Sequence, residues 1–214
     1  MTKPTLLPIF ILLSHFALAQ SPSKQTPQGE VVYHVCQRSF YDSNSDLHGD
    51  LNGLIQKLPY LQDLGVTSIL LFPLYESDCY HNYFANNFET IDPEFGTMDD
   101  FLNLIKEVHQ RGMKIYLDME TQYVTSKHLW WTDAVGNLDS KYSEYILFED
   151  EAHLVPATMV FDLRILNGFD GQVITATTVN LKSEKVLQYT IDLFSSFMDP
   201  NQDGDFSDGV DGFR

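Results

Sequence analysis

One stretch of the chain carries oxygen-bearing side chains at short, regular intervals. They follow the pattern D-x-N-x-D-x-x-x-D and are Asp42, Asn44, Asp46 and Asp50. Carboxylate and amide oxygens at alternate positions of a loop can wrap a Ca²⁺ ion. The loop is not an EF-hand, because Leu47 stands where that motif has its turn glycine. The other interpretation is an acidic turn in which Asp50 caps the helix that follows.

A second acidic loop near the end of the chain copies the first half of an EF-hand. Its oxygen-bearing residues are Asp199, Asn201, Asp203, Asp205 and Asp208, and Gly204 supplies the glycine at the sixth position. Val210 occupies the twelfth position, so the bidentate carboxylate of that motif is missing. A solvated turn therefore explains this loop at least as well as a metal site does.

Other catalytic patterns find little support in the sequence. The histidines show neither H-x-x-x-H nor H-E-x-x-H spacing, and no G-x-S-x-G occurs, so neither zinc nor a serine nucleophile is indicated. Glu120 is one carboxylate without a partner, for which a solvated or helix-capping role is the simpler interpretation. Cys36 and Cys79 are the only cysteines; one disulfide is possible, but not a disulfide scaffold.

The elements that must position these residues alternate between strand and helix. β-branched and apolar runs predict strands at residues 31–36, 67–72 and 113–117. Apolar residues recur every three or four positions in 51–64 and from 98 to about 111, which predicts helices. Thr97 is the expected N-cap of the second helix, and Pro59 interrupts the first.

Alternation with short links predicts a parallel α/β sheet covered by helices, either doubly wound or closed into a barrel. The lack of G-x-G-x-x-G after the first strand argues against a dinucleotide-binding sheet. The alternation breaks at about residues 119–178, a stretch rich in aromatic residues with short β-rich pieces, which we interpret as an inserted subdomain. Helical spacing resumes at 183–197, and a further strand begins in 210–214.

Composition narrows the possible partners. The 214 residues are 43% hydrophobic and 13% aromatic, which is typical of a globular protein rather than a disordered one. The net charge is 13 − 30 = −17, which disfavours nucleic acid and anionic lipid surfaces as partners. Neutral ligands such as sugars, and cations, remain compatible with it.

The N-terminal residues have the features of a secretory signal peptide. Lys3 precedes an apolar run over 6–16, and Ala17-Leu18-Ala19 is a small-x-small cleavage site. We therefore predict a signal peptide at 1–19, a flexible leader at 20–30 and a secreted or periplasmic protein. The apolar run is shorter than the ~20 residues that span a bilayer, so we expect no transmembrane segment in the mature chain.

Five segments, in chain order, resemble the α-amylases of glycoside hydrolase family 13. They are RSFYDSNSDLHGDLNG (38–53), LPYLQDLGVTSILLFPLY (58–75), IDPEFGTMDDF (91–101), RGMKIYLDME (111–120) and DGVDGFR (208–214). The resemblance implies a partial TIM (β/α)8 barrel, from strand 1 to the start of strand 4, with a small B-type subdomain after strand 3. On this view 31–118 form the first part of the barrel, 119–178 the subdomain and 179–214 the continuation.

The resemblance also assigns roles to individual residues. Asp118 and Arg214 would pair beneath the active site, where Arg214 would orient the nucleophile. Tyr83 would be an aromatic platform for the sugar, although a tyrosine that anchors its loop is nearly as good an interpretation. The likeness to oligosaccharide α-1,6-glucosidases implies structural Ca²⁺ bound by Asp42, Asn44, Asp46 and Asp50, together with the backbone carbonyl of His48.

The chain departs from the family pattern at the sugar site. Tyr123 stands where a sugar-binding histidine is expected, Phe84 replaces an aspartate, and Gln122 is also altered. The resemblance places the nucleophile two residues after Arg214 and the acid/base later, so we expect the chain by itself to be inactive. The intact protein would be an exported glycosidase that cleaves an α-glucan or malto-oligosaccharide with retention. The alternative is a degenerate, non-catalytic member that binds sugar or protein.

Overall fold

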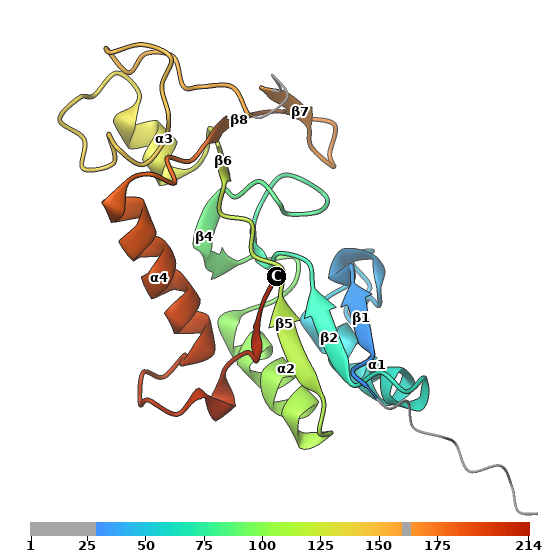
Figure 1. The fold of residues 1–214 in the computed structure, drawn as a ribbon. Helices are drawn as coiled ribbons and strands as arrows, with labels where there is room; N and C mark the ends of the chain where they lie inside the picture. The colour runs from blue at the N-terminus through green and yellow to red at the C-terminus, as the bar shows by residue number, and fades with distance from the viewer. Residues whose placement is uncertain (1–28, 160–163) are drawn as a thin grey trace, which may run out of the picture.

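A parallel sheet forms the centre of the molecule (Figure 1). The computed structural model describes residues 29–159 and 164–214; the predicted signal peptide and the leader up to residue 28 lie outside the described residues. The strands are β1 (Val32–Val35), β2 (Ser68–Leu71), β5 (Lys114–Leu117) and β9 (Gly212–Phe213), in the order β1-β2-β5-β9. Every neighbouring pair is parallel, as the alternation predicts.

Two helices connect the first three strands. α1 (Leu51–Asp63) begins at Asp50, whose side chain accepts a hydrogen bond from the backbone N–H of Gly53, and continues through Pro59. α2 (Met98–Gln110) begins with a capping box in which Thr97 and Asp100 satisfy each other's backbone N–H groups. The predicted helices and the Thr97 cap are therefore confirmed, with ends that differ by one residue.

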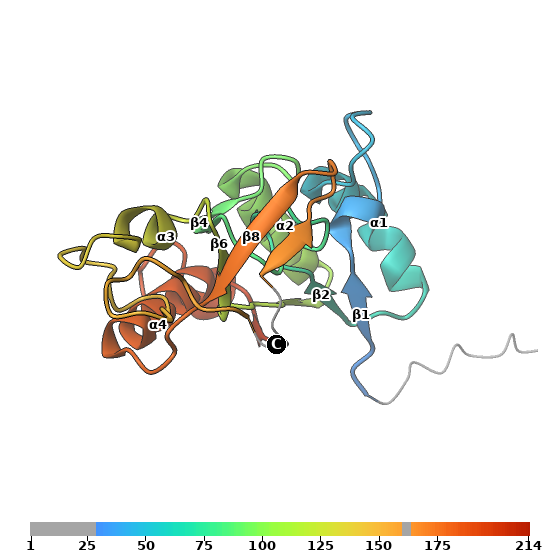
Figure 2. The ribbon, with the colours of Figure 1, turned by 90° about the horizontal axis from the view of Figure 1, so that it is seen from above.

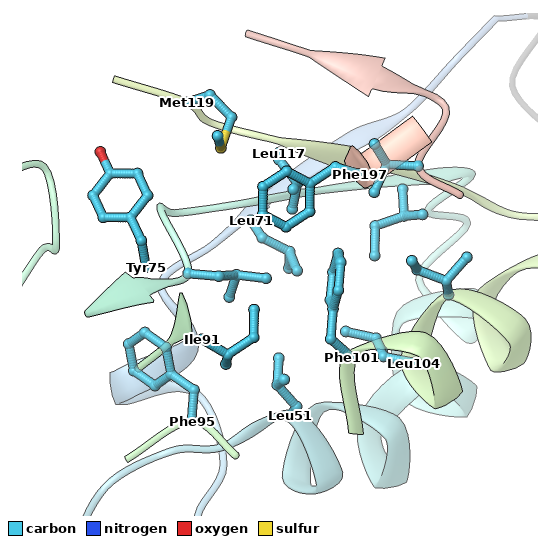
Figure 3. Packing of buried hydrophobic residues seen from close by; sticks show 14 of the residues in the cluster. Leu51, Leu71, Tyr75, Ile91, Phe95, Phe101, Leu104, Leu117, Met119 and Phe197 are labelled. Carbon is cyan, nitrogen blue, oxygen red and sulfur yellow. The ribbon is translucent and has the colours of Figure 1, made fainter. Parts of the chain in front are cut away.

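The core lies between these helices and one face of the sheet. Figure 3 shows Leu51 of α1 and Phe101 and Leu104 of α2 converging on Leu71 and Leu117 of the strands. Each buried leucine contributes about 1.5–3 kcal/mol, so this layer holds the sheet and helices together. Leu71 is fully buried but Leu70 only partly, because the helices cover one face of the sheet.

A hairpin between β2 and α2 was not predicted. β3 (Tyr75–Glu76) pairs antiparallel with β4 (Asn87–Ile91) across a register shift. Tyr75 packs edge-on against Phe88, with ring centroids 5.1 Å apart. The loop inside the hairpin carries Tyr83, and Cys79 is buried in it; both Cys79 and Cys36 are free thiols.

The stretch that breaks the alternation has its own small sheet (Figure 2). β6 (Tyr123–Thr125), β8 (Val173–Thr178) and β7 (Ile165–Asn167) are antiparallel in the order β6-β8-β7, and α3 (Leu129–Ala134) follows β6. α4 (Glu184–Met198) then returns to the main core, where Phe197 meets Phe101 at 5.9 Å. Two 3₁₀ turns, η1 (Gln37–Ser39) and η3 (Phe206–Asp208), complete the described elements. No helix in the two described stretches is long and apolar enough to cross a membrane.

Candidate functional site

Asp118 and Arg214 lie side by side at the carboxyl edge of the sheet. Asp118 follows β5 and Arg214 follows β9, and the parallel ladder continues through both, since the Arg214 N–H donates to the Leu117 carbonyl at 2.9 Å. Arg214 Nη1 donates to Asp118 Oδ2 at 2.7 Å. The carboxylate is buried, with 8% of its side chain exposed, whereas 61% of the arginine side chain is exposed. The structure thus brings together the two residues that the resemblance pairs.

Tyr83 joins this pair through its hydroxyl. It donates a hydrogen bond to the same oxygen of Asp118 that accepts from Arg214. Burial, together with the Asp118 carboxylate, raises the pKa of Tyr83 to about 12. The phenol therefore stays protonated at neutral pH and remains a donor. Among the described residues, Asp118, Arg214 and Tyr83 form the group that we call the Asp118 site.

His34 is a further neighbour of Asp118 that the sequence interpretation missed. Its Nε2 lies 3.6 Å from Asp118 Oδ2. Burial, reinforced by Arg214, lowers the pKa of His34 against the opposing pull of Asp118. The imidazole is thus favoured in its neutral form. β1 and β5 both pair with β2, so the sheet order brings His34 and Asp118 to the same edge, but no sequence signal gives the direction of the His34 side chain.

A row of aromatic rings runs across this edge of the sheet. Consecutive ring centroids are 4.5–5.7 Å apart, within the range of favourable aromatic contacts. In order, the rings are those of His34, Phe72, Tyr83, His81, Phe84 and Tyr123. The row therefore contains Phe84 and Tyr123, at which the resemblance leads us to expect polar residues; their ring centroids are 5.7 Å apart.

Arg38 fixes the loop that carries Tyr83. Its buried guanidinium bonds Asn82 Oδ1 at 3.1 Å and Asp92 Oδ2 at 3.2 Å. Asn82 in turn donates to the Tyr75 carbonyl at 2.9 Å. A buried charge held by partners on separate segments leaves the loop little freedom. Nothing in the sequence around Arg38 indicates this positioning role, because its partners Asn82 and Asp92 lie more than forty residues away along the chain.

Glu120 does not belong to the Asp118 site. Its carboxylate accepts the backbone N–H of Gln122 at 2.7 Å, and its backbone carbonyl accepts the hydroxyl of Tyr75 at 2.7 Å. The side chain thus stabilises the turn that leads into β6. This is close to the capping role expected from the sequence, although it caps a turn rather than a helix.

The acidic loop 42–50 is wrapped by hydrogen bonds to its own backbone. Asp42 accepts from the N–H groups of Ser45 at 2.6 Å and Leu47 at 2.9 Å, and Asn44 Nδ2 donates to Asp46 Oδ2 at 2.9 Å. Asp46 also accepts from the backbone N–H of His48 at 2.8 Å. Asp42, Asn44 and Asp46 are therefore brought together as the pattern predicts.

Asp50 faces the start of α1 instead. Its oxygens accept from Ser43 and from the Gly53 N–H at 2.6–2.8 Å. Within the described residues, no three histidine, cysteine or acidic side chains lie close enough together to hold a metal ion. The helix-capping alternative for Asp50 is confirmed, and the calcium site stays a prediction.

Comparison with known proteins agrees with this geometry. The family described as alpha amylase, catalytic domain, matches residues 34–168, more than half of the chain. The chain belongs to the α-amylase family. It is 37% identical over 149 residues to alpha-amylase 3 of Dictyoglomus thermophilum, which covers 70% of this chain and 30% of that protein. It is 40% identical over 126 residues to oligo-1,6-glucosidase of Bacillus cereus, covering 58% and 23%.

The fold of the family extends over most of the chain. The crystal structure of the α-amylase from H. orenii superposes with a TM-score of 0.68 at 28% identity, over 86% of this chain and 39% of that one. The partial-barrel fold class is thereby confirmed. The matches span 23–39% of these three proteins, so the chain covers well under half the length of its α-amylase-family relatives.

Proposed function

We propose that the full-length gene product is an exported glycoside hydrolase that cleaves α-glucans or malto-oligosaccharides with retention of configuration. The observation that carries the proposal is the Asp118 site, in which a buried carboxylate holds an arginine and a tyrosine at the edge where barrel enzymes place their active sites. Relatives named α-amylase and oligo-1,6-glucosidase support the substrate class.

Each residue of the Asp118 site has a chemical task in this proposal. Asp118 binds one Nη of Arg214, which leaves the rest of the exposed guanidinium to donate to a second carboxylate. By resemblance that carboxylate is the nucleophile two residues further on. Retaining hydrolysis needs this nucleophile and an acid/base about 5 Å apart. Tyr83 offers an aromatic face to the sugar while its hydroxyl fixes Asp118.

The test is hydrolysis of maltoheptaose by the full-length protein, followed by NMR of the first anomer released. We expect the α-anomer, and Arg214→Lys should lower kcat by about 10²-fold or more because a flexible ammonium cannot replace the planar fork. Arg164→Lys is the matched control, since Arg164 forms a surface pair with Glu149. An initial β-anomer, or full activity in Arg214→Lys, would contradict the proposal.

We also propose that the protein is secreted or periplasmic. The support is the charged start, apolar run and small-x-small site of residues 1–19. N-terminal sequencing of the exported protein should find Gln20 as the first residue. A mature protein that still begins at Met1 or Thr2 would overturn this part of the proposal. We propose no nucleic-acid partner, because a net charge of −17 repels the phosphate backbone.

We propose structural Ca²⁺ in the loop 42–50. The donors suit a hard cation: Asp42, Asn44, Asp46, Asp50 and the His48 carbonyl supply oxygen. A carboxylate has about four lone-pair positions, so Asp50 could cap α1 and still bind a cation. A bound Ca²⁺ would neutralise the loop's negative charge. The ion would thus stabilise the barrel edge rather than enter the chemistry.

The second candidate function is that of a non-catalytic family member that binds sugar or protein. The contact between Phe84 and Tyr123 favours it, because two apolar rings occupy positions at which the family pattern has polar sugar contacts. The double variant Phe84→Asp, Tyr123→His separates the two functions. A gain of hydrolysis from an inactive parent would support the degenerate binder, whereas a parent that already hydrolyses maltoheptaose would exclude it.

A further inference from the structure

A pocket is lined by residues of the β3–β4 hairpin, of α3 and the segments on either side of it, and of α4. Figure 1 labels β4, α3 and α4, which lie on one side of the molecule. Its volume is about 570 Å³, within the range of roughly 300–1,000 Å³ that ligand sites occupy. Tyr83, Asp118 and Arg214 are absent from its lining. It is therefore a hollow separate from the Asp118 site.

Aromatic side chains make one wall of this pocket. Tyr142, Tyr145 and Tyr189 are half-buried, and the last two pack edge-on against Trp130 with ring centroids 4.9 Å apart. Tyr142 completes the wall at 5.1 Å from Tyr145 and nearly perpendicular to it. Interlocked rings lose little conformational entropy when a ligand arrives, so the wall is preorganised.

Charged side chains of both signs also line the pocket. Glu76 and Glu89 contribute two carboxylates, and Lys127 and Lys141 contribute two ammonium groups. Part of this charge is already paired: Lys127 lies 2.6 Å from Asp78, and Lys141 sits over the ring of Tyr142 at 4.6 Å. A lining of balanced charge favours neither an anionic nor a cationic ligand.

The remaining polar groups are neutral. Asn86 and Asn87 add amides at the hairpin side of the pocket. His128, also in the lining, is uncharged because burial lowers its pKa to about 3. A neutral ligand with many hydroxyl groups matches this combination, since hydroxyls both donate and accept and a sugar ring presents an apolar C–H face to aromatic rings.

We propose that this pocket is a second carbohydrate site, which holds glucosyl units of an α-glucan away from the reaction centre. The choice of α-glucan rests on the proposed function, whereas the choice of a neutral sugar rests on the pocket's rings and balanced charge. The site would keep a polymeric substrate attached while the Asp118 site acts on another part of it. Short oligosaccharides would gain nothing from it.

The test is retention of the full-length protein in an amylopectin affinity gel, combined with hydrolysis of maltotriose. Tyr142→Ala removes part of the wall, and Thr132→Arg fills the pocket from its exposed α3 side without removing a ring. Both should weaken retention by about tenfold or more, the loss typical of a central contact. Tyr60→Ala, an exposed tyrosine on α1, is the matched control and should change nothing.

The outcomes separate this proposal from the proposed function. If both pocket variants are retained like the parent, or the parent is not retained, the second site is wrong even where maltotriose is hydrolysed. If no variant hydrolyses maltotriose but Tyr142→Ala and Thr132→Arg still lose retention, the hydrolase is wrong and the pocket stands. Tyr83→Ala should lower hydrolysis and leave retention intact.

Discussion

The two acidic loops, 42–50 and 199–208, begin with the same D-x-N-x-D spacing and fold in the same way over that part. In each, the first aspartate accepts the N–H five residues on: Asp42 from Leu47 at 2.9 Å, and Asp199 from Gly204 at 2.9 Å. That sixth residue is left-handed in both, with φ of 76° at Leu47 and 85° at Gly204. A D-x-N-x-D pattern therefore dictates local shape whatever surrounds it.

The surroundings of the two loops differ. The loop 42–50 follows β1 and so lies at the carboxyl edge of the sheet with the Asp118 site, whereas 199–208 precedes β9 at the opposite edge. Asp50 at the end of the first loop is buried and bonds Ser43 and Gly53; Asp208 in the second is exposed and bonds Asn201. In barrels the carboxyl edge serves function and the other edge stability. The last carboxylate is thus buried and bonded to α1 in the first loop, and exposed in the second.

The largest difference between the loops should come from their last carboxylates. Asp50→Ala removes the cap of α1, leaves the buried N–H of Gly53 without an acceptor and breaks the part-buried bond from the Ser43 N–H, so we expect a loss of about 2 kcal/mol. The matched Asp208→Ala should change stability by less than about 0.5 kcal/mol, as exposed sites do. Urea unfolding of the full-length protein in EDTA measures both. Equal losses would show that the anchoring difference carries no energy.

Calcium should distinguish the loops next. At about thirty times its Kd, Ca²⁺ bound to the folded state alone would add about 2 kcal/mol. Asp46→Asn removes charge from the loop 42–50 and should abolish most of that gain. The corresponding change in the other loop, Asp203→Asn, should leave it intact. The measurement is the shift of the urea midpoint between Ca²⁺ and EDTA. If Asp203→Asn rather than Asp46→Asn abolishes this shift, the ion binds in the loop 199–208 and the proposed calcium site in the loop 42–50 is wrong.

Much of the barrel portion was predictable, because its signals are local. The period of apolar residues fixes α1 and α2, and the cap at Thr97 needs only its neighbour Asp100. The β3–β4 hairpin was missed because its pairing is interrupted by a register shift between Tyr75 and Glu76, and few residues on either side alternate. Its stability comes from long-range packing such as Tyr75 on Phe88, which no window of sequence reveals.

The site was predictable in pairs but not as a group. Parallel neighbouring strands that end at Asp118 and Arg214 must bring these residues to one edge, and the structure does so. The hydrogen bond from Tyr83 to Asp118 Oδ2 was not predictable, and neither was the approach of His34 to the same oxygen. Both depend on the direction of side chains. The row of rings through Phe84 and Tyr123 likewise emerges only when separate loops meet.

A smaller effect concerns the sixth position of each loop. Gly204 meets no atom within 4 Å of where a Cβ would lie, so Gly204→Leu should suffer only the left-handed backbone strain, about 1 kcal/mol. The reciprocal Leu47→Gly relieves that strain and loses no packing, because Leu47 is 91% exposed. We expect it to be neutral or stabilising by up to about 0.5 kcal/mol, since the added freedom of the unfolded chain offsets part of the gain. Urea midpoints that move in the same direction for both swaps would contradict a shared loop geometry.

The smallest effect should appear at acid pH. Against partial desolvation, the backbone N–H groups of Leu47 and Ser45 lower the pKa of Asp42, and the Ser207 N–H lowers that of Asp205. A carboxyl whose pKa is lower in the folded state stabilises that state above its unfolded pKa of about 3.9, and the stabilisation disappears as pH falls through the folded value. In EDTA, the urea concentration at the unfolding midpoint should therefore decrease as the pH is lowered below about 4. Asp42→Asn and Asp205→Asn should each make this decrease smaller. Asp42→Asn should flatten it more, because four backbone donors hold that carboxylate whereas Asp205 depends on Ser207. Equal flattening in the two variants would contradict this explanation. It would mean that the number of N–H donors does not determine how much each carboxylate contributes to the loss of stability at acid pH.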